Sequence, residues 1–68
     1  MDSVFKVIEI VGTSKESYEK AIEKAVSKAS ITVKAISWFE VLQQRGAVQD
    51  GKVTEFQVVL KVGFKLID

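Results

Sequence analysis

The chain has to form a stable fold from only 68 residues, without a single cysteine or histidine. Its length allows one domain, over 1–68, and one small core. Such a core does little more than offset the conformational entropy lost on folding, which is on the order of 100 kcal/mol. Small domains make up the difference with disulfides, a structural metal or association with other chains. The absence of cysteine and histidine removes the first and disfavours the second, so we expect self-association.

The charges predict neither a nucleic-acid partner nor a membrane partner. Ten lysine and arginine residues against nine acidic residues give a net charge of +1, and the basic residues are spread along the chain. No apolar run reaches the roughly 18 residues of a membrane span, and the N-terminus lacks the pattern of a secretion signal. Together with the absence of cysteine, these features lead us to expect a cytoplasmic protein.

Apolar side chains at helical spacing predict one helix, which is opened by Thr13 and runs to about residue 30. Thr13 and Glu16 have the form of a capping box, in which each side chain accepts a hydrogen bond from the backbone of the other. Six apolar residues then follow at spacings of three and four, namely Tyr18, Ala21, Ile22, Ala25, Val26 and Ala29. This stripe predicts a helix that buries one face.

Three runs rich in β-branched and aromatic residues predict strands over 4–11, 34–45 and 53–66. Gly12 is expected to close the first strand, and a turn over 47–52, which contains Asp50-Gly51, to join the last two. The element order is β-α-β-β, which places the chain in the α+β class. If the last strand lies between the other two, in the order 1-3-2, all neighbouring strands are antiparallel and the helix covers one face.

The predicted sheet has more apolar surface than one helix can cover. In the last strand, one face alone holds Phe56, Val58, Leu60, Val62, Phe64 and Leu66. The first strand is apolar on both faces. In the second strand, alternation directs Phe39 and Val41 toward the helix, and Trp38, Glu40 and Leu42 away from it. The face without a helix therefore carries Trp38 and Gln57 among aliphatic residues, which is typical of an interface or a ligand site.

Most enzyme mechanisms are difficult to build from these residues. The absence of histidine and cysteine excludes Ser-His-Asp, Cys-His and zinc sites. The four glycines are too far apart for a phosphate-binding loop, and no spacing of carboxylates resembles a cation-binding loop. We therefore expect no catalytic residue, no metal site and no enzymatic activity.

Three residues are candidates for ligand binding. Trp38, the only tryptophan, fits either a core or interface anchor or a stacking platform for a flat aromatic ligand. Gln57 lies between apolar neighbours, so its amide must find partners across an interface or on the edge of a heteroaromatic ring. Arg45, the only arginine, fits a surface ion pair, stacking or anion recognition.

Four segments resemble the bacterial dodecin family over nearly the whole chain. They are V-I-E-I-V-G-T-S at 7–14, S-W-F-E-V at 37–41, Q-R-G at 44–46 and F-Q-V-V-L-K-V-G-F-K-L at 56–66. The combination of W-F-E-V, R-G and F-Q-V makes the resemblance specific. It implies a hollow, spherical homododecamer of β-α-β-β protomers, in which flavins bind as stacked pairs between tryptophans of neighbouring subunits.

The resemblance also implies roles for the three candidate residues. Trp38 matches the stacking tryptophan, Gln57 the glutamine that hydrogen-bonds the polar edge of the isoalloxazine, and Arg45 the arginine near the flavin. The implied ligand is FMN or riboflavin, and the implied function is flavin sequestration, storage and photoprotection. An indole stacked on a flavin can donate an electron to its excited state and take it back, which quenches it.

Other functions remain open on the sequence alone. The chain fits a ligand-free homo-oligomeric interaction module, and a flavin-using enzyme is a further alternative. Some family members bind coenzyme A, and antiparallel pairing of the first and last strands predicts that Lys6 and Lys65 lie close together. Repeated around a threefold axis, these lysines could attract coenzyme A or another anionic nucleotide.

Overall fold

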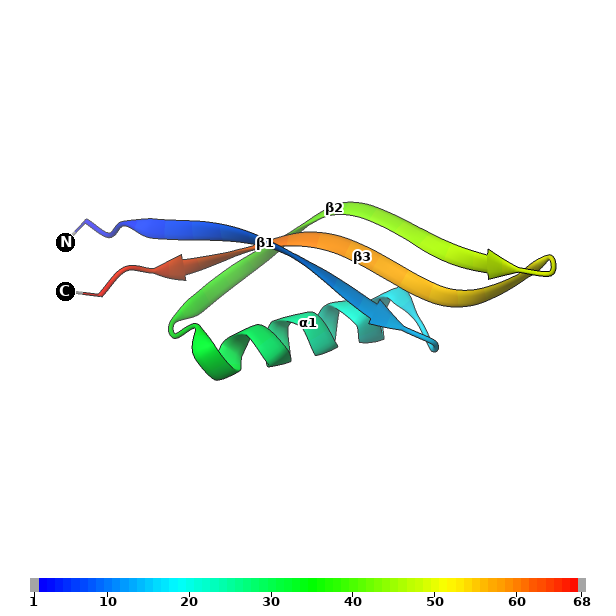
Figure 1. Cartoon of the computed structure of the whole chain (residues 1–68). Coiled ribbons are helices and arrows are strands. Elements are labelled where there is room, and N and C mark those ends of the chain that lie inside the picture. The colour runs from blue at the N-terminus through cyan, green and yellow to red at the C-terminus, as the bar shows by residue number, and fades with distance from the viewer. Residues whose placement is uncertain (1, 68) are drawn as a thin grey trace.

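The computed structural model describes residues 2–67, which form four elements in the order β-α-β-β (Figure 1). These are β1 (Phe5–Ser14), α1 (Tyr18–Thr32), β2 (Ile36–Gln49) and β3 (Lys52–Lys65). The strands form one antiparallel sheet in the order β1-β3-β2, and α1 lies against one of its faces. The predicted α+β class and strand order are therefore confirmed. In the part of the chain that is described, no helix is long and apolar enough to cross a membrane.

The core lies between α1 and the central strand. Val58, Leu60 and Val62 on β3 are fully buried, as predicted from their alternation, and they cluster with Ala21 and Ala25 of α1. Burying each of these three β3 side chains contributes roughly 1.5–3 kcal/mol. Small residues on the helix let it approach the sheet closely, so this core is thin and built mostly around one strand.

Gly12 does not close β1 as predicted; the strand continues to Ser14. A Cβ atom at Gly12 would overlap the backbone oxygen of Ala21 and lie 2.9 Å from the Cβ of Ala25. Gly12 is therefore explained by the close packing of α1 on β1, and not by a turn. A glycine that allows such an approach looks the same in sequence as one that ends a strand.

The predicted capping box is wrong. Thr13 belongs to β1, where it pairs with Gln57, so it cannot also cap α1. Ser17 is the N-cap instead, because its side chain accepts a hydrogen bond of 3.0 Å from the backbone N–H of Lys20. At the other end, α1 continues to Thr32, slightly beyond the predicted end.

Helix α1 covers only part of its face of the sheet. It packs against β1 and β3 and barely contacts β2. Phe39 points to the helix side, opposite Val62, as predicted, yet half of its surface stays exposed. Beyond the last β1 pair, Ser14 with Phe56, β2 and β3 continue as a two-stranded arm (Figure 1).

The turn at the tip of this arm is shorter than predicted. Strand β2 reaches Gln49 and β3 begins at Lys52, so only Asp50 and Gly51 form the turn. Their φ values of 52° and 76° are both positive, as in the tight two-residue turns that match the twist of a hairpin. The Asp-Gly signal therefore located the turn correctly, although its boundaries were drawn too wide.

Candidate ligand-binding face

A bulge in β2 places Trp38 and Arg45 on the same face of the sheet. Strict alternation would send them to opposite faces. The pairing shifts between Val41 and Gln43, however, so Leu42 has no partner and the alternation reverses after it. Trp38 then pairs with Gly63, and Arg45 with Gln57. The alternation predicted for this strand therefore holds from Trp38 to Val41 and fails at Leu42.

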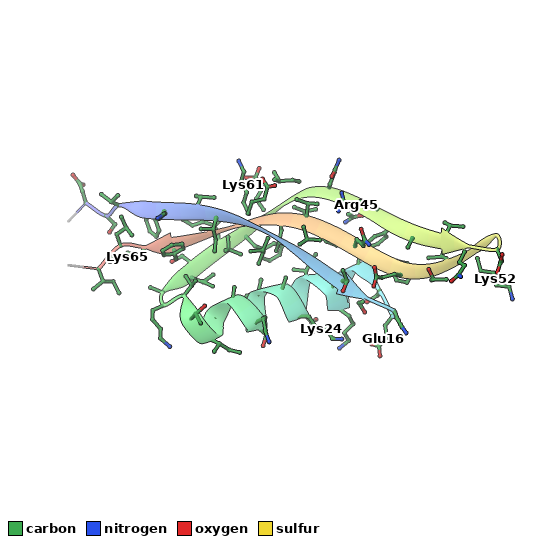
Figure 2. The ribbon with its side chains drawn as sticks, in the orientation of Figure 1. Glu16, Lys24, Arg45, Lys52, Lys61 and Lys65 are labelled. Atoms are coloured by element: carbon green, nitrogen blue, oxygen red, sulfur yellow. The ribbon has the colours of Figure 1, made fainter. Side chains whose placement is uncertain are left out.

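We call the face turned away from α1 the open face; on β3 it carries Gln57, Val59, Lys61 and Gly63. Figure 2 shows Arg45 and Lys61 pointing away from α1, whereas Glu16 and Lys24 lie on the helix side. All three predicted binding residues are located on the open face, which confirms that Trp38 and Gln57 share the side without a helix.

The indole of Trp38 lies directly over Gly63. A Cβ atom at Gly63 would overlap Cε2 and Cζ2 of the indole and come within 2.6 Å of Cη2. The Phe5 ring flanks the indole, with the two centroids 4.9 Å apart and the ring planes inclined at 55°. Trp38 is nevertheless 43% exposed. Its indole is thus supported by β3 and by Phe5, while the rest of its surface is free to contact a ligand.

A second group of side chains forms a polar network around Gln57. Arg45 Nε donates to Gln57 Oε1 at 2.8 Å, and Gln57 Nε2 donates to Glu55 Oε1 at 2.8 Å. Arg45 Nη1 also donates to Gln43 Oε1 at 3.5 Å. Because arginine only donates and a carboxylate only accepts, the network fixes which end of the Gln57 amide faces each neighbour. One lone pair and one N–H of that amide remain for a ligand.

Within one chain the aromatic and polar parts of this face are well separated. Gly63, under the indole, and Gln57 are six residues apart on β3. At about 3.3 Å per residue this is roughly 20 Å, which exceeds the length of a three-ring heteroaromatic system. The backbone positions of Trp38 and Gln57 in one chain are therefore farther apart than such a ring is long, which favours a site that takes the two residues from different copies.

Lys6 and Lys65 lie close together in the sheet, as predicted. Phe5 pairs with Lys65, and Lys6 pairs with Phe64, so the two lysines are neighbours along the sheet. Alternation directs their side chains to opposite faces, however, because they are one register step apart. They do not form a joint anion site within one chain. Binding of coenzyme A stays a prediction.

The candidate residues lie outside the grooves along α1. Two grooves, of about 680 and 490 Å³, run between α1 and β1, and neither is lined by Trp38, Arg45 or Gln57. Within residues 2–67, no group of three or more aspartate or glutamate side chains is arranged to hold a metal ion. On the open face itself, Trp38 and Phe5 form an aromatic end, and the hydrogen-bonded network around Gln57 forms a polar end.

The sequence singled out Trp38, Arg45 and Gln57 but missed the residues that position them. Gly63 and Phe5 support the indole, and Glu55 and Gln43 complete the polar network. The contact between Glu55 and Gln57 could have been predicted from the sequence, because residues two apart in a strand lie on the same face. The contact between Phe5 and Trp38 crosses the whole sheet, from β1 to β2, and no local pattern predicts it.

Fold and open face together define a class of small α+β protein, a β-α-β-β protomer that presents an aromatic platform and a polar network on an uncovered sheet face. Residues 4–67 match the model of the Dodecin family. A relative from Thermus thermophilus named Dodecin is 47% identical over 66 residues, which are 97% of this chain and 96% of that protein. The chain therefore belongs to the dodecin family.

Solved structures agree with this assignment. Dodecin from Streptomyces davaonensis superimposes with a TM-score of 0.96 at 40% identity, over 100% of both chains. A calcium dodecin from Mycobacterium tuberculosis, described as calcium chelating with a novel calcium-binding site, gives a TM-score of 0.83 at 41% identity. The match covers 96% of this chain and 93% of that one.

Proposed function

We propose that this protein assembles into a closed homo-oligomer, a dodecamer by family resemblance, and binds FMN or riboflavin without catalysing a reaction. In this proposal it sequesters, stores and photoprotects the flavin. The observation that carries the proposal is the Trp38 indole, which rests on Gly63 and still exposes 43% of its surface on the open face. A planar, electron-rich ring held in this way is suited to stack on an isoalloxazine.

Exposed apolar side chains support the assembly. On the open face they are Phe5, Val7, Val11 and Trp38, each at least 40% exposed. A small protein that leaves such a surface uncovered normally buries it against a partner or a ligand. A second copy is the partner we propose, because the backbone positions of Trp38 and Gln57 in one chain are farther apart than a flavin ring is long.

The polar network supports specificity for the flavin ring. Gln57 keeps one acceptor and one donor free, which complements the alternating carbonyl and N–H groups along the polar edge of an isoalloxazine. Arg45 also keeps guanidinium N–H groups that are not used by Gln57 or Gln43, and these can donate to a ring carbonyl or to the phosphate of FMN. In this proposal Trp38 stacks on the flavin ring, and Gln57 hydrogen-bonds its polar edge.

A fluorescence titration tests this function. FMN is titrated with the purified, flavin-free assembly, and light scattering monitors its size. We expect near-complete loss of flavin fluorescence with a stoichiometry of one flavin per chain. An intact assembly that leaves the fluorescence unchanged would support the ligand-free interaction module instead. Steady oxidation of an added reductant by the bound flavin would support an enzyme.

Gln57→Leu should weaken flavin binding without removing the quenching. The leucine keeps the approximate size of the side chain but loses both hydrogen-bonding groups, so the Kd for FMN is expected to rise about tenfold to a hundredfold. At saturation the fluorescence of the bound flavin should remain quenched, because Trp38 is unchanged. Gln49→Leu, at the far end of β2, is the control. An unchanged Kd for Gln57→Leu would contradict the role given to this amide.

A further inference from the structure

We propose that Gly63 is a positioning residue of the flavin site, because the absence of a side chain there lets the Trp38 indole rest on β3. Phe5 holds the indole from the side of β1. This inference rests on the proposed function, since it concerns how Trp38 is presented to the ligand. It adds to the flavin site two residues that contact the tryptophan and not the flavin.

The backbone of Gly63 does not itself require glycine. Of the glycines in residues 2–67, only Gly51 has a positive φ, so Gly63 adopts a conformation open to any residue. A glycine inside a central strand weakens it, because it contributes no side-chain packing. Its neighbours Val62 and Phe64 have the large side chains expected there. The choice of glycine therefore needs a reason outside the local conformation.

The position of Trp38 supplies this reason. The indole occupies the space that a side chain at Gly63 would fill, since a Cβ would overlap Cε2 and Cζ2 and lie 2.6 Å from Cη2. Those atoms belong to the rigid indole rather than to the end of a flexible chain. An alanine at Gly63 would therefore lift or turn the whole ring away from the sheet.

Phe5 limits how the indole can respond. Its ring lies 4.9 Å from the Trp38 ring, centroid to centroid, and is tilted by 55°. The indole is thus confined below by β3 and at one side by an aromatic ring. A platform whose orientation is set before binding loses little conformational entropy when a ligand stacks on it. Displacement of the indole should therefore weaken stacking even though the tryptophan itself is still present.

A double-mutant cycle on the full-length protein tests the proposal. Gly63→Ala is made in the natural chain and in the Trp38→Ala variant, and thermal unfolding of the flavin-free assemblies is compared. With Trp38 present we expect Gly63→Ala to lower the Tm and to shift the tryptophan emission. Without the indole the same substitution should leave the Tm unchanged or raise it, because alanine suits a strand better than glycine. Lys61→Ala, which changes another residue on the same face of β3, is the control for the effect of a substitution on Tm.

Flavin binding provides the second readout. Gly63→Ala is expected to raise the Kd for FMN about tenfold and to lengthen the fluorescence lifetime of the bound flavin. A purely structural glycine would lower the Tm but leave the lifetime of the bound flavin unchanged. Phe5→Leu should cause a smaller change in the same direction.

Two results would overturn the role of Gly63. One is a Gly63→Ala variant with the tryptophan emission, Kd and flavin lifetime of the natural protein. The other is an equal fall in Tm with and without Trp38, which would mean that the glycine acts independently of the indole. A natural chain that binds no flavin would overturn the proposed function together with the effect on binding. The thermal cycle would then decide separately whether Gly63 seats the indole.

Discussion

Leu60→Ala is expected to abolish the folded assembly at room temperature. Leu60 is fully buried in the centre of β3, where it pairs with Ile10 on β1 and Val41 on β2. Truncating a buried leucine to alanine costs about 2–5 kcal/mol. A chain of this size has little more stability than that from its own core. Loss of the protomer core should therefore prevent assembly and leave an unfolded or aggregated chain.

Circular dichroism and light scattering on Leu60→Ala and Leu66→Ala measure this effect. Leu66 supplies a matched control, because the same atoms are removed from a side chain that is 47% exposed just after β3. The control should stay folded and assembled. Equal stability of the two variants would contradict the view that the contact of β3 with α1 is the main source of protomer stability.

Trp38→Ala is expected to remove flavin quenching and most of the affinity. Tryptophans at the centre of a binding surface commonly contribute at least 2 kcal/mol, which corresponds to about a thirtyfold or larger rise in Kd. The excited flavin also loses the nearby indole that we propose as its electron donor. Any flavin that still binds should therefore be fluorescent. The measurements are the Kd by ultrafiltration and the fluorescence lifetime of bound FMN.

Trp38→Phe separates binding from quenching. Phenylalanine keeps a flat aromatic face, so much of the stacking should remain, but it is a far poorer electron donor than indole. We expect this variant to bind FMN more tightly than Trp38→Ala while leaving the bound flavin brighter than in the natural protein. If both variants bind and quench like the natural protein, Trp38 is not the platform.

Much of the fold could be predicted because its signals are local and periodic. Alternation along β3 correctly identified Val58, Leu60 and Val62 as the core, and the helical stripe correctly placed Ala21 and Ala25 against them. The predicted ends of elements were less accurate, because Gly12 and Thr13 have local signals that match a strand end and a helix cap. Tertiary contact decides such cases, and here Gly12 makes room for the helix.

The candidate site could be predicted by residue type but not by geometry. Trp38, Arg45 and Gln57 are chemically unusual at their positions, and all three lie on the open face. Their common location depends on the bulge at Leu42, which alternation alone does not reveal. The support of Trp38 by Gly63 joins two strands, and the distance from the indole to Gln57 emerges only from the register. Pairing across the sheet therefore carries the missing information.

Native mass spectrometry of the protein mixed with FMN tests the central claim most directly, because it reports assembly and ligand together. We expect a dodecamer that carries one FMN per chain, with free monomer carrying none, since we propose that the aromatic and polar parts of the site come together between copies. A monomer that binds FMN by itself, or a full assembly that remains without flavin at saturating FMN, would contradict the account.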